Sequence, residues 1–146
     1  MKITFVSFRY VALFFLCAIA LSIFFMSSSK DTVYIYDDDG VSKTSLKNTV
    51  FTLRKFLPKM KTVSINSAGV IDGKWVKNAS LFIIPGGADL PYCRKLNGKG
   101  NRVIKDYVAK GGSYLGICAG AYYGSSYIEF DKGGILEVIG KRELSF

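Results

Sequence analysis

A cysteine set between glycines is the strongest chemical signal in this sequence. Residues 116–120 read Gly-Ile-Cys-Ala-Gly, after the apolar residues 113–115 and before a segment rich in small residues, 121–126. This order is typical of a nucleophile elbow, in which a strand, one sharp turn carrying the nucleophile and a helix follow each other. Cys118 is therefore the candidate nucleophile, at a helix N-terminus whose dipole favours thiolate over thiol.

The 146-residue sequence contains no histidine, so a cysteine–histidine catalytic pair cannot be formed within it. Attack of a thiolate on an amide needs a proton donor for the leaving ammonia. Lysines and tyrosines are present, but no pattern positions one of them beside Cys118. Two interpretations of this cysteine stay open: a reactive thiol that captures a ligand, and a structural cysteine buried in the core, where free cysteines are common.

A pair of glycines follows the short apolar run 81–84. Gly86 and Gly87 are expected to present backbone N–H groups as an oxyanion hole, and the alternative is a turn that only ends the strand. We count Ala119, directly after Cys118, with these ligand-binding residues. Three polar residues near the site are expected by default to lie exposed on the surface, and each is also a candidate for orienting a ligand: Asp89, Tyr92 and Glu129.

Apolar spacing predicts an α/β fold to position these residues. Short β-branched and aromatic runs predict strands at 32–36, 61–65, 81–84 and 113–117, and a hairpin of 127–130 and 135–139 turning at 131–134. Apolar residues at helical spacing predict a helix over 46–57, with Ser42 or Thr44 capping its start and Pro58 marking its end. A second apolar stripe predicts a helix over 103–108, which Gly111-Gly112 ends.

Strands that alternate with helices imply a parallel sheet with helices on both faces. In such sheets the ligand site lies at the carboxyl ends of the strands. Three segments are expected at that edge: loop 37–40, loop 85–92 and the turn at Cys118.

The first 29 residues form a separate region. They carry Lys2 and Arg9, then an uncharged apolar run over 11–26, then the serines 27–29, and Lys30 follows them. This is typical of a secretory signal peptide cleaved near Ser29. The alternative is an uncleaved anchor, because the stretch 3–26 is long enough to span a bilayer. We expect a domain over 32–146 that is exported (periplasmic or extracellular) or membrane-anchored outside the cytoplasm.

Export bears on the cysteines, since an oxidising compartment permits disulfides. Cys93 lies six residues after Gly87, in the loop expected beside Cys118. We hypothesise that the two cysteines form a disulfide that silences the thiol.

The chain carries 20 Lys and Arg against 11 Asp and Glu, a net charge of +9. The basic residues are scattered and lack aromatic interleaving, which favours a solvated surface over a nucleic-acid interface. The sequence predicts no metal, no cofactor and no nucleic-acid partner. A homo-oligomer is compatible with it, because an unpaired sheet edge invites a partner.

Five segments, in this order, resemble the N-terminal domain of eukaryotic-type biotin–protein ligases: 85–92 (PGGADLPY), 108–112, 116–124 (GICAGAYYG), 128–130 and 142–146 (RELSF). That domain belongs to the class I glutamine amidotransferase-like superfamily, which has a flavodoxin-like α/β fold. The resemblance runs from about residue 33 to residue 146, across the whole predicted domain.

The resemblance implies roles for three residues. In active members of the superfamily, a cysteine at the position of Cys118 attacks the side-chain amide of glutamine, and a histidine and a glutamate further along activate it. Gly86 and Gly87 match the oxyanion loop, whereas the histidine has no counterpart. The domain is therefore expected to be short at its C-terminus and to lack full glutaminase or biotin-ligase activity.

Three functions follow from these observations. The first is an amidotransferase-like domain that binds a small acyl or amide ligand at Cys118. The second is a catalytically inert interaction module in which this cysteine is structural. The third is a cysteine amidohydrolase completed by a histidine from a partner chain or from missing sequence. Thiol reactivity separates the first from the second.

Overall fold

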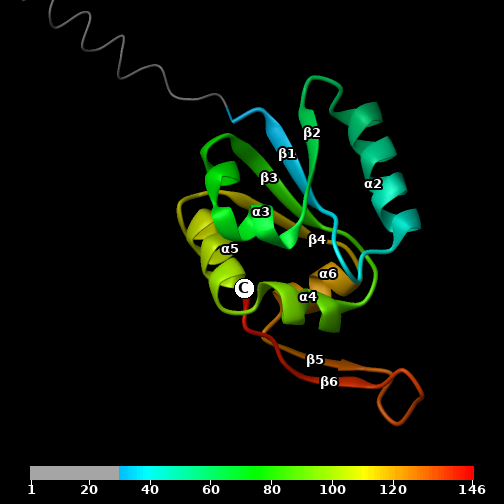
Figure 1. The fold of residues 1–146 in the computed structure, drawn as a ribbon. Helices are drawn as coiled ribbons and strands as arrows, with labels where there is room; N and C mark the ends of the chain where they lie inside the picture. Colours follow the sequence, from blue (N-terminus) through cyan, green and yellow to red (C-terminus); the bar gives the residue numbers. More distant parts are fainter. Residues whose placement is uncertain (1–29) are drawn as a thin grey trace, which may run out of the picture.

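A computed structural model describes residues 30–146, so the predicted signal peptide or anchor lies outside the described residues. Figure 1 shows a sheet with helices packed beside it and a hairpin at the carboxyl edge of the strands. The elements are β1 (Thr32–Tyr36), α2 (Lys43–Phe56), β2 (Lys61–Ile65), α3 (Ser67–Asp72), η1 (Lys74–Lys77), β3 (Ala79–Ile84), α4 (Asp89–Leu96), α5 (Lys99–Ala109), β4 (Ser113–Gly116), α6 (Ala119–Gly124), β5 (Tyr127–Phe130) and β6 (Val138–Lys141).

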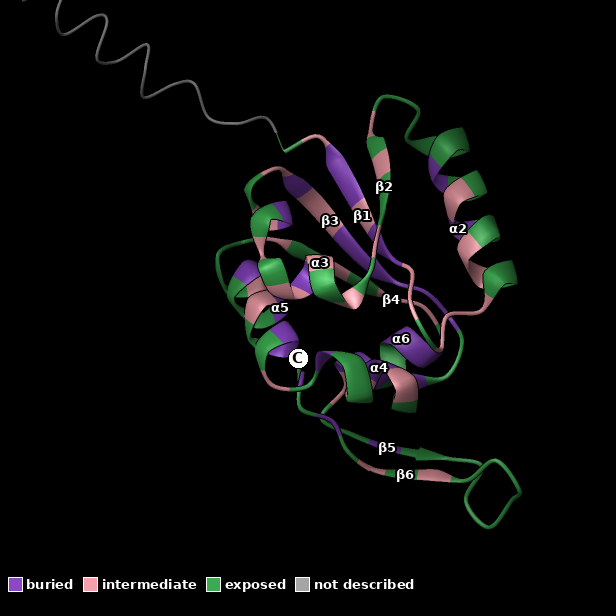
Figure 2. Ribbon diagram, in the orientation of Figure 1, coloured by how far each residue is buried: buried purple, intermediate pink, exposed green. Residues whose placement is uncertain are grey.

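The main sheet has four strands in the order β2-β1-β3-β4, all parallel. The central strands β1 and β3 are the most buried (Figure 2), as their continuous apolar runs predict. Phe82, Ile83 and Ile84 of β3 are completely inaccessible to solvent. The predicted α/β fold with a parallel sheet is confirmed.

Successive side chains of β1 and β3 point to opposite faces of the sheet, and each face has its own core. Ile35 and Ile83 pack with Leu53 of α2 on one face. Tyr36 and Phe82 face the larger core, which α3, η1, α4, α5 and α6 cover. Helices therefore lie on both faces, as expected.

The two predicted helices are present and end where expected, but α5 begins at Lys99, four residues before the predicted apolar stripe. The side chain of Ser42 caps α2 by accepting a hydrogen bond from the Ser45 N–H, and α2 ends at Phe56, before Pro58. The helix α5 ends at Ala109, and Gly111 follows with a φ of 85°. This left-handed conformation is the reason for a glycine there.

Two predictions about the chain path are wrong. The predicted loop 85–92 ends at Ala88, because Asp89–Leu96 forms the helix α4. Pro91 lies in the first turn of α4, where a missing N–H costs nothing, so it does not prevent the helix.

The second hairpin strand is Val138–Lys141 rather than 135–139. The carboxylate of Asp131 accepts a hydrogen bond from the Leu136 N–H, and the Glu137 carboxylate accepts one from the Gly133 N–H. These bonds hold residues 131–137 in a closed loop, so strand pairing resumes only at Val138. Within residues 30–146, no helix is both long and apolar enough to cross a membrane.

Four tyrosines of the larger core give a pH prediction. Burial is the main cause that raises the pKa of Tyr36, Tyr92, Tyr114 and Tyr123 above the usual 10.0, to about 12 for Tyr92. In the unfolded chain these hydroxyls lose their protons near pH 10, so above that pH the unfolded state binds fewer protons than the folded state.

The stabilisation from these tyrosines is complete below about pH 10 and is lost as pH rises towards about pH 12. We expect the four tyrosinate absorbance changes to appear together with loss of the circular dichroism signal. Independent titration of all tyrosines near pH 10 in a folded protein would contradict this.

Candidate active site

Cys118 lies at the turn between β4 and α6, with φ of 51° and ψ of −110°. A positive φ is unusual for a residue other than glycine and marks a sharp, strained turn. Hydrogen bonds fix the backbone on both sides: the Ile117 N–H donates to the Ile84 carbonyl at 3.0 Å, and the Ala121 N–H donates to the Cys118 carbonyl at 2.9 Å. The Cys118 side chain is exposed.

The glycines around Cys118 are required by close backbone contacts. A Cβ atom on Gly116 would overlap the backbone of Gly120, and a Cβ atom on Gly120 would overlap the carbonyl oxygen of Ile84 at the end of β3. Neither glycine needs a positive φ, so the constraint at both positions is space. The Gly-Ile-Cys-Ala-Gly spacing is thus explained by packing of α6 against the ends of β4 and β3.

The Gly86-Gly87 loop lies directly beside this turn. A Cβ atom on Gly86 would be 3.3 Å from the Cys118 Cβ atom and 3.1 Å from the Ser45 hydroxyl oxygen. Gly87 has a φ of 158°, and a Cβ atom there would overlap the carbonyl oxygen of Gly40. The structure therefore brings the predicted oxyanion loop and the predicted nucleophile together at the carboxyl edge of the sheet.

The predicted oxyanion donors differ in availability. The Gly86 N–H donates to the Ser45 hydroxyl at 2.9 Å, so it is already occupied and its prediction as a donor is wrong for this arrangement. Among the described residues, the N–H groups of Gly87 and Ala119 have no acceptor. Of the predicted donors, these two are therefore not occupied by another group of the described chain.

Tyr92 supports the loop rather than facing a ligand. Its ring is completely buried, and its hydroxyl donates to the carbonyl of Pro85 at 3.1 Å, with the Gly40 carbonyl at 3.3 Å. Burial, followed by the nearby Cys118 and Asp89, raises the pKa of Tyr92 to about 12. Tyr92 therefore remains a neutral donor beneath the loop.

Asp89 is also buried, and its partner was not anticipated from the sequence. Its carboxylate accepts a hydrogen bond from Arg142 Nε at 2.6 Å, and both side chains are less than a tenth exposed. The two residues are 53 positions apart, so only the motif RELSF at the end of the chain hinted at Arg142. The pairing neutralises the Asp89 charge at the site.

Glu129 has the exposed position that was expected by default, whereas the hypothesised disulfide is wrong. Glu129 lies on β5 and pairs with Lys132 at 3.3 Å. Cys93 and Cys118 are both free, so the hypothesised disulfide is not formed. Cys93 is half-buried against the larger core, and burial raises the pKa of its thiol.

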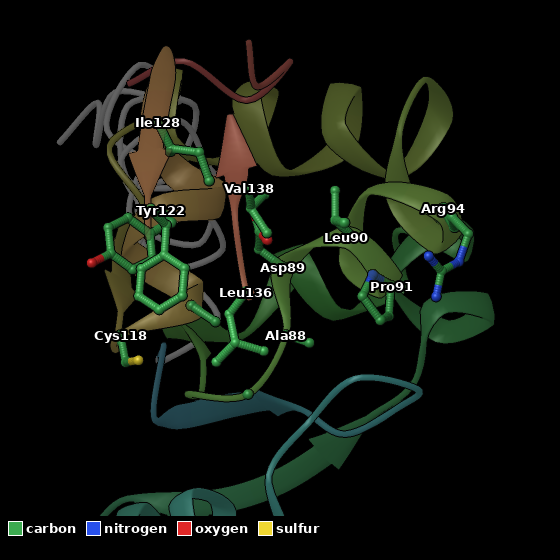
Figure 3. Close-up of a pocket in the computed structure, with 13 residues that line it drawn as sticks. Ala88, Asp89, Leu90, Pro91, Arg94, Cys118, Tyr122, Ile128, Leu136 and Val138 are labelled. Carbon is green, nitrogen blue, oxygen red and sulfur yellow. The ribbon is translucent and has the colours of Figure 1, made fainter. Parts of the chain in front are cut away.

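A cavity of about 430 Å³ opens beside Cys118 (Figure 3), within the size range of small-molecule sites. Loop 87–88, helix α4 and the turn at Cys118 form one part of its wall, and the hairpin forms the other. The hairpin wall was missed from the sequence, because nothing in its alternation shows which side faces a site. Thirteen residues line the cavity: Gly87, Ala88, Asp89, Leu90, Pro91, Arg94, Cys118, Ala119, Tyr122, Ile128, Phe130, Leu136 and Val138.

The four-stranded parallel sheet with its helices defines an α/β protein of the flavodoxin-like class. A peptidase E-like protein of Listeria monocytogenes EGD-e has a crystal structure that matches with a TM-score of 0.60, over 86% of this chain and 68% of that chain. The two sequences are 15% identical, so this likeness shows the fold alone.

Residues 31–146 match the family described as "Biotin-protein ligase, N terminal", and the chain belongs to this family. The resemblance drawn from the sequence motifs is thereby confirmed.

Two curated relatives show how much of a longer protein this match covers. The chain is 39% identical over 117 residues to an uncharacterised protein of Chlamydia muridarum (strain MoPn / Nigg), which is 78% of this chain and 45% of that protein. It is 37% identical over 116 residues to the biotin–protein ligase of Schizosaccharomyces pombe, which is 78% of this chain and 18% of the ligase. The chain thus spans less than half the length of these relatives.

The close contact at Gly120 gives a stability prediction. Replacing a helical glycine by alanine ordinarily favours the helix by about 1 kcal/mol. In Gly120→Ala the new Cβ atom meets the Ile84 carbonyl, so we expect a net destabilisation of about 1–3 kcal/mol in urea unfolding.

Gly100→Ala in α5 is the matched control, because its Cβ atom would meet only side chains, the nearest being Leu96 at 3.0 Å. We expect this variant to be less destabilised than Gly120→Ala. If Gly120→Ala were as stable as the unmodified protein, the packing account of the turn would be wrong.

Proposed function

We propose that this domain captures a small acyl or amide compound at the Cys118 thiol, and that the turn at this residue acts as a nucleophile elbow. The observation that carries the proposal is the exposed thiol at a positive-φ turn that lines a cavity of about 430 Å³. Gly87 and Ala119, whose N–H groups have no acceptor among the described residues, line the same cavity. Unpaired backbone donors beside a nucleophile suit the oxygen of a bound acyl group.

The chemistry proposed is acyl transfer to sulfur. The thiol gives its proton to solvent, and the sulfur forms a bond with the acyl carbon. The carbonyl electron pair moves onto oxygen, which accepts hydrogen bonds from the N–H groups of Gly87 and Ala119. When the carbonyl re-forms, the bond to the leaving group breaks and that group departs with the electron pair.

The nature of the leaving group decides which substrates suit the site. A thiolate leaves without a proton, whereas ammonia from an amide needs a general acid. The 146-residue sequence has no histidine, and the nearby Tyr92 hydroxyl is bound to backbone carbonyls. This supports covalent capture of activated acyl compounds and binding of amides without hydrolysis.

We further propose that these 146 residues by themselves neither hydrolyse glutamine nor ligate biotin. The missing general acid supports the first statement. The match to only 18% of the ligase from Schizosaccharomyces pombe supports the second. A histidine supplied by another chain or by further sequence would instead give an amidohydrolase, and glutaminase assays on the 146-residue protein distinguish the two.

Alkylation tests the proposed role of Cys118. In the folded full-length protein we expect iodoacetamide to alkylate Cys118 at least about tenfold faster than the half-buried Cys93, because burial disfavours the Cys93 thiolate. Peptide mass spectrometry reports each cysteine separately. Cys118→Ala should remove the fast reaction, and Cys93→Ser should leave it intact.

If Cys118 reacted only after unfolding, the cysteine would be structural. The interaction-module function would then be favoured.

Export is also a proposal, supported by the composition of residues 1–29. We propose that the domain reaches the outside of the cytoplasm and that the leader is removed near Ser29.

For the full chain with a C-terminal tag, we expect the tagged product in the exported fraction, with an N-terminus near residue 30 by mass spectrometry. A product in the membrane fraction that retains residue 1 would favour the anchor. A product in the cytoplasmic fraction would contradict export.

A further inference from the structure

We propose that the cavity beside Cys118 selects acyl compounds that carry a carboxylate at the end remote from the reacting carbonyl, and that Arg94 binds this carboxylate. The inference rests on the proposed function, since it names the class of ligand that Cys118 would meet. It follows from the positions and charges of the lining residues.

Only one charged side chain that lines the cavity lacks a close partner of opposite charge among the described residues. Of the thirteen lining residues, only Asp89 and Arg94 are charged. The Asp89 carboxylate is buried and paired with Arg142 Nε at 2.6 Å, so its negative charge is neutralised. The positive charge of Arg94 is therefore the net charge that a ligand in this cavity meets.

Arg94 is available to a ligand. Its side chain is 66% exposed, and its only ion pair among the described residues is with Asp39 at 4.0 Å, the longest of the ion pairs there. An exposed pair at that distance contributes little stability, and a competing carboxylate can replace Asp39. The planar guanidinium also suits two-point binding of a carboxylate.

The arrangement separates the charge from the thiol. In Figure 3, Cys118 and Arg94 lie at opposite ends of the lining, with apolar side chains between them. Two of these side chains are open to solvent, Leu136 at 64% exposed and Leu90 at 45%. An apolar chain laid along them would cover this surface, with its reactive carbonyl at Cys118 and its carboxylate at Arg94.

Matched maleimides test the proposal without requiring the natural ligand. One is 6-maleimidohexanoic acid, which is anionic at neutral pH, and the other is its methyl ester, which has the same reactive ring and chain but no charge. In each, the Cys118 sulfur adds to the ring double bond and a proton from solvent adds to the neighbouring carbon. We expect the full chain to react at Cys118 about three- to fivefold faster with the acid than with the ester at low salt.

Three variants identify the origin of this preference. Arg94→Gln should bring the acid-to-ester rate ratio to about one. Lys95→Gln removes the same charge from the next residue of α4, which is exposed and does not line the cavity, so the ratio should persist. Asp39→Asn removes the internal competitor for Arg94 and should raise the ratio.

The outcomes distinguish the two proposals. Fast reaction at Cys118 with both probes at equal rates, or a preference that survives Arg94→Gln, overturns the role of Arg94 and leaves Cys118 as a reactive thiol. Failure of both probes to modify Cys118 in the folded protein overturns the proposed function itself. A preference lost equally in Lys95→Gln would mean that the general positive charge of the surface is responsible.

Discussion

The whole site depends on one close contact between backbones, where α6 begins over the ends of β4 and β3. Gly120 lies against the carbonyl of Ile84, and Gly116 lies against Gly120, with no space for a Cβ atom at either glycine. Because the chain reverses in so little space, Cys118 takes a positive φ. The same compactness places Gly86 so near Cys118 that a Cβ atom on Gly86 would lie 3.3 Å from the Cys118 Cβ atom. A fold that relaxed this contact would separate the thiol from the N–H groups beside it.

The polar side chains beneath and beside Cys118 are paired with other groups of the protein, so they present little charge to a ligand. Tyr92 supports the Gly86-Gly87 loop from below through a buried hydroxyl, and Arg142 neutralises Asp89. Tyr92 and Asp89 were both predicted from the sequence to bind a ligand, yet the Tyr92 hydroxyl is bound to backbone carbonyls and the Asp89 charge is neutralised. What remains for recognition is an apolar cavity with a thiol and one exposed guanidinium, which favours ligands that are apolar along their length and anionic at one end.

The sheet and the helices α2 and α5 could be predicted because apolar periodicity and end signals act over a few residues. The sharp turn at Cys118 could be predicted for the same reason, because the glycines that permit it are its near neighbours in the sequence. The α4 helix could not be predicted, because a proline is compatible with a helix only in its first turn and the sequence does not show that Pro91 lies there. The pairing of Asp89 with Arg142 spans 53 positions and leaves no local pattern. The disulfide hypothesis failed because α4 places Cys93 against the core instead of in a loop beside Cys118.

The most direct test of the account is transfer of an acyl group from a small thioester to the folded protein. A glutaryl thioester carries both the reactive carbonyl and the remote carboxylate. Transfer to sulfur exchanges one thioester for another and releases a thiolate, so no general acid is needed. We predict a glutaryl adduct on Cys118, located by peptide mass spectrometry, that forms faster in the folded protein than in urea. No adduct on Cys118, or equal rates in the folded and unfolded protein, would contradict the claim that the fold makes this cysteine an acyl acceptor.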